Sequence, residues 1–389
     1  MSEVAQAPHS SPDGRIPQLR FPEFDGVWES RLLKDAVKIN PRSGELPDEF
    51  IYIDLESVKK GYLIKETQIN KIGAPSRAQR LLNKNDVIFQ TVRPYQKNNY
   101  FFNLDGDYVA STGYAQLRVL NSPEFLYQAL HTDRFVYDVM ARSTGTSYPA
   151  INSTDLSKIK LNLPTKPEQQ KIAAFLTAVD NKIEQLSTKQ VLLGEYKKGL
   201  MQQIFSQAIR FKADDGCDFP DWEEKKLGDI LDYEQPTNYI VDSTEYDNSF
   251  DMPVLTAGKS FVLGYTNETH KVFENIPVII FDDFTTANKY VDFPFKVKSS
   301  AMKILKPKDS FVNIRLIFEF IQMLNFPIGE HKRYWISEYQ DLKIPFPSFE
   351  EQTKIANFLS SIDNKIEQVG KQLDESKQFK KALLQQMFV

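Results

Sequence analysis

The sequence predicts an α+β fold: two mixed α/β domains in tandem, each followed by a long helix, with the helices packed as an antiparallel coiled coil about a pseudo-two-fold axis. The first observation is a repeated amphipathic stretch, EQQKIAAFLTAVDNKIEQ from Glu168 and EQTKIANFLSSIDNKIEQ from Glu351. The second is that Pro164 to Phe205 and Pro347 to Phe388 align at a constant offset of 183, with 20 identities in 42 positions. The third is the stretch before each helix, roughly 130 to 150 residues, which suits one domain.

These observations divide the chain into five segments. Residues 1–15 are expected to be a disordered leader, because MSEVAQAPHSSPDG lacks the basic and apolar regions of a secretion signal. The other segments are a first domain (16–163), a first helix (164–208), a second domain (209–346) and a second helix (347–389). The domains also begin alike, since FPEFDGVWESRLLKDA from Phe21 resembles FPDWEEKKLGDI from Phe219.

Within the domains, short apolar runs predict strands and longer periodic patterns predict helices. The expected strands are 86–90, 115–120, 277–281 and 301–305, and the expected helices are 123–141 and 313–324. The interiors have diverged, because NDVIFQTVRPYQKNNY in the first domain stands where NIPVIIFDDFTTANKY stands in the second. The scaffold therefore repeats, whereas one surface of each domain does not.

Each long helix has apolar residues alternating by four and three, as in Ile172, Leu176, Val179 and Ile183, and this heptad pattern predicts coiled-coil packing. A helix of about 39 residues is roughly 58 Å long. Parallel packing would require the second domain to carry the chain back over that length, so antiparallel packing is expected. Lys197 and Lys380 occupy equivalent seam positions, and we expect buried stems with ammonium groups in water.

Composition and charge narrow the class of protein. The chain is 41% hydrophobic and 26% charged, and no apolar run approaches the ~20 residues that span a bilayer. A single cysteine, Cys217, excludes an internal disulfide framework and favours a cytoplasmic protein. The net charge of −4 hides two basic segments, Lys59 to Lys97 and Lys289 to Lys308. Each domain thus has a basic segment of its own, which the overall net charge conceals.

These features resemble the specificity subunits of type I DNA restriction-modification enzymes. The resemblance extends over nearly the whole chain from about Ile16. It rests on the two EQxKIAxFLxxxDNKIEQ segments, the closing LMQQIF and LLQQMF, GTSYPAINSTDLSKIKLNLP from Gly145, VRPY from Val92, and IIFDDFTT with VKSSAMKIL.

The resemblance implies that each domain is a target recognition domain reading one half of a bipartite, asymmetric site in double-stranded DNA. The helices would set the gap and dock two methyltransferase (modification) subunits, and through them the motor and nuclease (restriction) subunits. S-adenosylmethionine, ATP and Mg are expected on those partner subunits and none on this chain.

The residues themselves also favour a chain without catalysis, cofactor or metal. The histidines His9, His131, His270 and His331 are scattered without metal-ligand spacing, and no other candidate ligands surround them in sequence. Neither a phosphate-cradling glycine loop nor a Walker lysine is present, nor the Asn/Asp-Pro-Pro-aromatic tetrapeptide of an adenine methyltransferase.

In the first domain, Arg93 and Lys97 flank Tyr95 just after an expected strand, where arginine can meet a guanine edge or a phosphate. The competing interpretation is an ordinary solvated turn. Four further basic residues are expected at phosphates, with a merely solubilising face as the alternative: Lys71, Arg77, Arg80 and Lys84. A later loop adds Thr146 and Tyr148.

In the second domain, the segment after an expected strand supplies residues that can read adenine and thymine edges or contact phosphates: Thr285, Thr286, Asn288, Lys289 and Tyr290. Asp282 and Asp283 can accept from cytosine, or simply cap a turn; a shared metal is not expected, because successive strand residues point to opposite faces. At the place equivalent to Gly145–Tyr148, a basic and aromatic cluster adds Lys332, Arg333 and Tyr334.

Two other classes of protein stay open. One is a coiled-coil scaffold that gathers proteins through its end domains, with the basic segments as solvated surface. The other is a stand-alone nuclease or methyltransferase, which the missing motifs disfavour.

Overall fold

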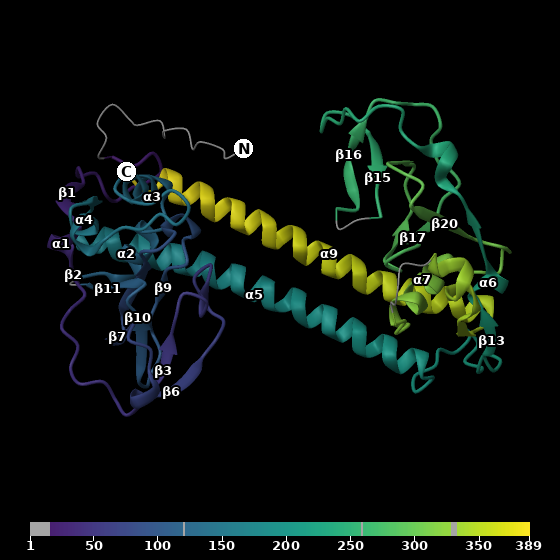
Figure 1. Ribbon diagram of the computed structural model, residues 1–389, viewed down its shortest axis with the longest axis horizontal. Coiled ribbons are helices and arrows are strands. Elements are labelled where there is room, and N and C mark those ends of the chain that lie inside the picture. The colour runs from purple at the N-terminus through teal and green to yellow at the C-terminus, as the bar shows by residue number, and fades with distance from the viewer. Residues whose placement is uncertain (1–15, 120, 258–259, 328–332) are drawn as a thin grey trace. The chain divides into compact units, whose positions relative to one another are not determined.

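The computed structural model describes residues 16–119, 121–257, 260–327 and 333–389. The expected leader 1–15 and Lys332 lie outside these ranges. The chain forms two compact units: unit 1 comprises Met1–Thr188 and Gly370–Val389, and unit 2 comprises Lys189–Val369. The long helices α5 (Lys166–Phe205, teal in Figure 1) and α9 (Phe349–Gln386, yellow) each contribute one half to each unit. The compact units therefore do not coincide with the sequence repeats.

The domain of unit 1 contains two four-stranded sheets. One has the order β2-β11-β8-β9 with antiparallel pairs throughout, and the other has the order β6-β3-β10-β7 with a parallel β3–β10 pair. Its strands are β1 (Glu29–Leu32), β2 (Val37–Ile39), β3 (Glu49–Ile53), β4 (Val58–Lys59), β5 (Tyr62–Leu63), β6 (Thr67–Asn70), β7 (Ala78–Leu81), β8 (Asp86–Gln90), β9 (Tyr100–Phe101), β10 (Tyr108–Ser111), β11 (Tyr114–Val119) and β12 (Lys160–Leu163). Its helices are α1 (Leu33–Ala36), α2 (Pro123–Ala129), α3 (Asp133–Ala141) and α4 (Ser153–Ser157), with short turns η1 (Lys71–Gly73) and η2 (Pro94–Gln96).

The domain of unit 2 follows the same plan. Its four-stranded antiparallel sheet has the order β14-β20-β17-β18, and a second sheet, β16-β15-β19, again contains one parallel pair. Its strands are β13 (Glu223–Lys226), β14 (Leu231–Glu234), β15 (Met252–Leu255), β16 (Val262–Thr266), β17 (Val278–Asp282), β18 (Asn288–Val291), β19 (Lys296–Val297), β20 (Met302–Pro307) and β21 (Lys343–Phe346). Its helices are α6 (Leu227–Ile230), α7 (Ile314–Met323) and α8 (Tyr334–Ser337), with η3 (Pro236–Tyr239) and η4 (Tyr339–Asp341).

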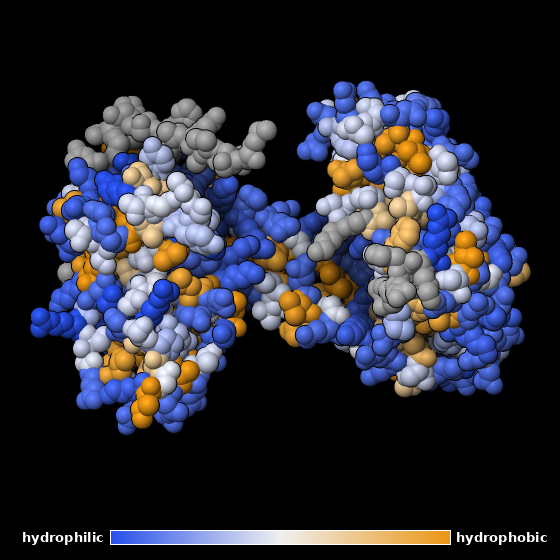
Figure 2. All heavy atoms as spheres, viewed as in Figure 1, coloured by the Kyte–Doolittle hydropathy of each residue, from blue (hydrophilic) through white to orange (hydrophobic). Residues whose placement is uncertain are grey.

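The central strands β8 and β17 are buried along their whole length, as their apolar sequences DVIFQ and VIIFD require. In unit 1, Val87 and Phe89 pack with Leu126 of α2 and Phe135 of α3. No helix among the described residues is long and apolar enough to span a membrane. On the face shown in Figure 2, the apolar residues form small separate patches on a largely hydrophilic surface.

The predicted strands are confirmed to within one or two residues at each end, and β8 matches its prediction. The predicted helix 123–141 is wrong, because α2 ends at Ala129 and α3 begins at Asp133. Thr132 causes the restart: its Oγ1 accepts from the backbone N–H of Phe135 at 3.3 Å and donates to the carbonyl of Ala129 at 2.8 Å. A threonine N-cap of this kind begins a new helix.

Each long helix is joined to its domain by a buried carboxylate near its first turn. Glu168 accepts two hydrogen bonds from Arg20, at 2.7 and 2.8 Å, and a third from Trp28 Nε1. Glu351 is held in the same way by Arg210 at 2.8 Å and by Trp222 Nε1 at 2.7 Å. Hydrogen bonding to the buried carboxylates raises the pKa of both arginines.

The two helices run antiparallel in both units, which confirms the predicted coiled-coil arrangement. In unit 1, Leu176 near the start of α5 shares an apolar cluster with Leu383 near the end of α9. In unit 2, Ile204 near the end of α5 shares a cluster with Ile355 near the start of α9.

The seam lysines differ from their prediction. Lys380 pairs with Asp180 of the opposite helix at 2.5 Å. Lys197 pairs with Asp363 at 2.8 Å and with Glu319 at 2.9 Å. Their ammonium groups therefore neutralise carboxylates within the structure instead of pointing into water. The sequence indicated buried stems but not the acidic partners.

The two helix ends are followed by equivalent backbone contacts. In unit 2, the N–H of Ile209 donates to the carbonyl of Gln203 at 3.2 Å. In unit 1, the N–H of Leu19 donates to the carbonyl of Gln386, 183 positions after Gln203, at 2.9 Å. The first residues of the first domain therefore contact the end of α9 in the same way that the first residues of the second domain contact the end of α5.

This equivalence predicts that a circular permutant will fold. Five residues separate Gln203 from Ile209, and joining Val389 to Pro17 leaves five between Gln386 and Leu19. A chain that starts at Ala208, contains this junction and ends at Gln207 should melt within a few degrees of the natural chain, because only surface loops change.

Thermal unfolding followed by circular dichroism measures this. A control permutant opened at Gly194, inside α5, should be much less stable because a helix is cut. Equal destabilisation of both permutants would contradict the prediction.

His131, which lies between α2 and α3, predicts that the stability of the fold depends on pH. Burial lowers the pKa of His131 to about 4, and the nearby charges of Lys380 and Lys97 add to this effect. The unfolded chain binds a proton near the ordinary value of 6.5, so between about pH 6.5 and 4 it binds more protons than the folded chain, and stability falls as the pH falls. At about 1.4 kcal/mol per pKa unit, the loss is on the order of 3 kcal/mol.

Denaturation midpoints at pH 7.5 and pH 5 for the natural chain and for His131→Gln will show whether this occurs. The variant should lose less stability than the natural chain. An equal loss in both would show that His131 does not stay neutral in the fold.

Candidate functional site

The two predicted segments of unit 1 lie side by side. The segment that follows β8 meets the loop at 144–150, because the N–H of Arg93 donates to the carbonyl of Pro149 at 2.7 Å and Ile151 N–H donates to Thr91 at 3.0 Å. The guanidinium of Arg93 lies 4.2 Å from the ring centre of Tyr148. Arg93 and Lys97 both have φ of 54°, in the left-handed region, and they bracket η2 with the exposed Tyr95. The loops form one surface, named here the unit 1 loop surface.

The equivalent segments meet in unit 2. Tyr334 N–H donates to the carbonyl of Asp283 at 2.9 Å, and Trp335 N–H donates to the Asp283 carboxylate at 3.0 Å. The unit 2 loop surface thus consists of the segment after β17 and the segment before α8. The unit 1 loop surface likewise consists of the segment after β8 and the segment before α4. The sequence predicted this equivalence from loop position alone. Lys332 is not among the described residues.

The lysines of unit 1 that are predicted to contact DNA already form ion pairs within the chain, and these pairs differ in strength. Lys71 pairs with Glu45 at 2.7 Å, and Lys84 pairs with Asp105 at 3.2 Å, both at the surface, where such pairs contribute about 0–1 kcal/mol. Lys97 pairs with Asp133 at 2.6 Å and donates to the carbonyl of His131 at 2.9 Å. Lys97 therefore fastens η2 to the start of α3, which is a structural role.

The arginines of unit 1 are more available. Arg77 is exposed. Arg80, on the edge strand β7, is half-buried, its buried Nε has no hydrogen-bond partner, and desolvation lowers its pKa. Thr146 is exposed in the loop that carries Tyr148.

In unit 2, Thr285, Lys289 and Arg333 are exposed. Thr286 takes a φ of 56°, and Asn288 Nδ2 donates to its carbonyl at 3.1 Å, so these two residues shape the turn. The unit 2 loop surface therefore offers small polar groups and two cations.

One aromatic prediction in unit 2 needs correction. Tyr334 is only 2% exposed and packs on Phe326, so its side chain belongs to the core. Its basic and aromatic neighbours misled the sequence-based assignment, because burial is set by tertiary packing. Tyr290 is half-buried, with the Arg315 guanidinium 4.7 Å from its ring centre, and its contact with DNA stays a prediction.

Asp282 and Asp283 support the loop and are not available to read bases. Asp282 Oδ1 accepts from the backbone N–H of Phe284 at 2.8 Å, which is the capped turn considered as the simpler interpretation. Asp283 pairs with the buried Lys303 at 3.4 Å.

The expectation that no ligand set surrounds the histidines is wrong for His270. The fold brings Asp242, Glu268 and His270 together with ligand atoms within 4.8 Å of one another. However, Asp242 pairs with Lys271 at 3.0 Å, and Glu268 pairs with the buried Lys296 at 2.9 Å. The carboxylates are already neutralised by lysines, so the cluster is an ion-pair network.

The long helices carry a further exposed surface that the sequence analysis did not predict. Four exposed residues after Asp180 are identical to their counterparts after Asp363, namely Asn181, Lys182, Glu184 and Gln185 with Asn364, Lys365, Glu367 and Gln368. From Leu186 to Tyr196, by contrast, no residue matches its counterpart. Identity resumes at Lys197 and includes the exposed Lys198, Gln202 and Gln203, equivalent to Lys381, Gln385 and Gln386.

Core packing does not explain identity at exposed positions, and the unmatched stretch argues against simple persistence of a duplication. Because the helices are antiparallel, each unit brings the first matched block of one helix beside the second matched block of the other, as the Asp180–Lys380 and Lys197–Asp363 pairs show. Each unit thus has the same composite surface, named here the repeated helix face. A surface presented twice suits two copies of one partner.

The duplicated scaffold thus carries two unlike loop surfaces and a repeated helix face. The chain belongs to the family of the type I restriction modification DNA specificity domain, whose model matches residues 26–193 and 220–376.

Relatives carry the same description. The chain is 52% identical over 126 residues to the specificity subunit of the type I restriction enzyme EcoR124I/EcoR124II of Escherichia coli, a match covering 31% of each protein. It is 25% identical over 276 residues to the putative MjaX specificity subunit of Methanocaldococcus jannaschii, covering 60% of each. These matches span less than two thirds of the length of either relative.

Solved structures share the fold. The S subunit of a type I restriction-modification system from M. genitalium aligns over 96% of this chain and 99% of its own, with a TM-score of 0.65 and 17% identity. A chain from a study of complex assembly and conformational transition of the type I R-M system aligns over 92% and 96%, with a TM-score of 0.52 and 23% identity.

Proposed function

We propose that this chain is the non-catalytic, sequence-specific DNA-binding subunit of a type I restriction-modification complex. Each domain reads one half of a bipartite, asymmetric site in double-stranded DNA. The observation that carries the proposal is that equivalent loops adjoin in both domains but display different side chains. Since base edges are distinguished by the donors and acceptors presented to them, unlike loop surfaces read unlike half-sites.

In the first domain, Arg93 is the proposed base reader, because its fork-shaped guanidinium can bind the guanine edge in bidentate fashion. Tyr95, Thr146 and Tyr148 border it on the unit 1 loop surface. The phosphate contacts proposed elsewhere in the same domain are Lys71, Arg77, Arg80 and Lys84.

In the second domain, Thr285, Thr286 and Asn288 are the proposed readers of adenine and thymine edges. Lys289 and Arg333 supply the positive charge for adjacent phosphates.

The helices have two proposed tasks. Their paired length sets the gap between the half-sites, and the repeated helix face of each unit docks one methyltransferase subunit. Through those subunits the chain joins the motor and nuclease subunits. S-adenosylmethionine, ATP and Mg belong to the partners, where methylation, translocation and cleavage take place. We place the complex in the cytoplasm, because the single Cys217 is exposed and free, as in a reducing compartment.

Substitution of Arg93 tests the reading surface. Arg93→Ala should weaken binding of the assembled complex to its site by about 1–3 kcal/mol and relax discrimination in one half-site only. Arg93→Lys should not restore discrimination, since an ammonium lacks the bidentate fork. The site is first defined by mapping methylated bases in cells, and affinities are then measured by fluorescence anisotropy with either half scrambled.

Lys97→Met is the matched control, because Lys97 is engaged with Asp133. It should lower the melting temperature with little change in half-site discrimination. If Arg93→Ala weakened native and scrambled duplexes equally, Arg93 would be only a phosphate contact. A protein-only scaffold would show no steep weakening of DNA binding with salt, whereas counterion release requires it for a DNA-binding protein.

The repeated helix faces predict the stoichiometry of the partner. Gln185→Arg should leave one methyltransferase subunit per chain, Gln368→Arg should do the same, and the double variant should bind none, because a bulky cation replaces an exposed residue of each face. Native mass spectrometry of the co-purified proteins gives the ratios directly.

Glu195→Arg, in the unmatched stretch of α5, should retain two partner subunits. Two subunits retained by the double variant would show that docking uses another surface.

A further inference from the structure

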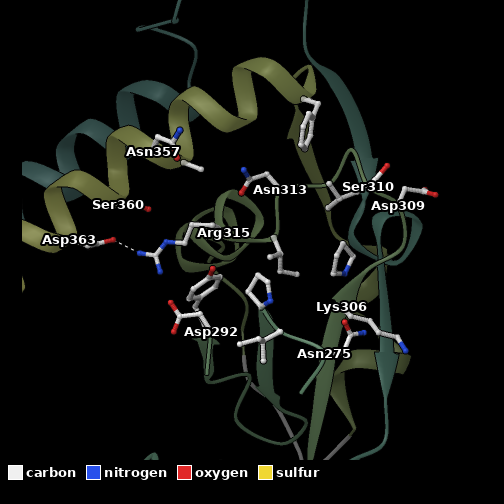
Figure 3. A pocket seen from close by; sticks show the side chains of 18 of the residues that line it. Asn275, Asp292, Lys306, Asp309, Ser310, Asn313, Arg315, Asn357, Ser360 and Asp363 are labelled. Atoms are coloured by element: carbon white, nitrogen blue, oxygen red, sulfur yellow. Dashed lines mark hydrogen bonds and ion pairs between the residues drawn. The ribbon is translucent and has the colours of Figure 1, made fainter. Parts of the chain in front are cut away.

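Both units contain a cavity in which the same part of a long helix forms one wall. In unit 2, a cavity of about 1000 Å³ is lined on α9 by seven residues that include Ser360, Asp363, Asn364 and Glu367. Ser360 and Asp363 are labelled in Figure 3. In unit 1, a cavity of about 520 Å³ is lined on α5 by Thr177, Asp180, Asn181 and Glu184. Each of these α5 residues lies 183 positions before its α9 counterpart. The cavities are therefore equivalent, and their differences are informative.

The opposite wall is formed by equivalent short helices, α7 in unit 2 and α2 in unit 1. Aligning their N-cap residues, Asn313 and Ser122, places Leu316, Ile317 and Phe320 on Phe125, Leu126 and Ala129, all buried. The same alignment places Glu319 on Gln128 and Arg315 on Glu124. An arginine in one cavity thus corresponds to a glutamate in the other.

In unit 2, Arg315 occupies its own cavity. It donates a hydrogen bond to Asp363, shown as a dashed line in Figure 3, pairs with the buried Glu319 at 3.1 Å, and lies over the ring of Tyr290. Lys197 contacts the same two carboxylates. The network contains two cations and two anions, so its charges balance.

In unit 1, no cation stands at the position of Arg315, and the whole cavity is lined by two lysines, Lys60 and Lys380, and by four carboxylates, Glu66, Glu124, Asp180 and Glu184. Asp180 is held by Lys380 at 2.5 Å and by Gln128 Nε2 at 2.8 Å, while Glu124 stands where unit 2 has Arg315. Gln128 is 1% exposed, and its Oε1 has no hydrogen-bond partner. An unsatisfied buried acceptor costs roughly 1–3 kcal/mol. A cationic donor in the cavity would balance the excess of carboxylates.

The rest of the unit 1 cavity suits a guanidinium. Its walls include Tyr62, Tyr100, Phe101 and Tyr127, and aromatic faces attract a planar cation. Burial, followed by the negative charges of Asp180 and Glu184, raises the pKa of Tyr62.

We propose that the unit 1 cavity binds an arginine side chain of the methyltransferase subunit that docks on the repeated helix face of unit 1. The proposal rests on the function proposed above. The partner is favoured because Asn181 and Glu184 belong both to that face and to the cavity wall, so the cavity is continuous with the interface. Unit 2 supplies its own Arg315, so the two docked subunits are held differently.

The first test uses a model compound. N-acetyl-arginine methylamide should give a saturation-transfer NMR signal with the full chain, and the neutral citrulline analogue should not. Glu124→Arg copies the arrangement of Arg315 in unit 2 and should abolish the signal while keeping or raising the melting temperature. Equal signals from the arginine and citrulline compounds, or an unchanged arginine signal in a folded Glu124→Arg variant, would overturn the proposal.

The second test uses the complex. Glu124→Arg should weaken binding of one of the two methyltransferase subunits by at least about tenfold, as expected for the loss of one charge-assisted contact. The matched variant Arg315→Glu in unit 2 should leave binding at unit 1 unchanged. If the natural chain binds two subunits and Glu124→Arg binds both as tightly, this proposal fails and the proposed function stands. If the natural chain binds neither methyltransferase nor DNA, the proposed function itself fails.

Discussion

The buried carboxylate at the start of each long helix is the contact on which the rest of the structure depends. Glu168 and Glu351 each satisfy an arginine and a tryptophan that come from the first residues of a domain. Removing one partner of such a buried pair costs about 3–5 kcal/mol, because the other charge is left without compensation. Each carboxylate therefore ties the start of its helix to the first residues of its domain.

Because the scaffold is duplicated, residues that must be the same in both units occupy different positions from residues that must differ. In the proposed function, packing and docking need the same residues in both units, and the matched blocks of α5 and α9 include identical exposed positions. The proposed recognition needs different residues, and the loops after β8 and β17 share a place in the fold but no sequence pattern. Under this proposal, changes in the loops alter what each domain reads while the helix positions stay constant.

Much of this could be predicted from the sequence because the relevant forces act locally or repeat. The heptad pattern indicated the paired helices, and the apolar run 86–90 indicated β8. The sequence could not reveal the end of α2, where a threonine cap overrides a continuous helical pattern, or the burial of Tyr334, which depends on Phe326. It also missed the partners of the seam lysines, because an ion pair between helices joins residues far apart in the chain.

Those ion pairs give the seam a property that an all-apolar seam lacks. Lys380 meets Asp180 in unit 1 and Lys197 meets Asp363 in unit 2, so the helices are in a register that satisfies both pairs. A slip of one heptad moves the contact by about 10 Å at ~1.5 Å per residue, and apolar residues would still meet apolar residues. The lysines and aspartates, however, would be separated within the seam, which is costly when charges are partly desolvated. A few polar seam residues thus select one register among several that are equally apolar, and the proposed spacing of two half-sites requires a single register.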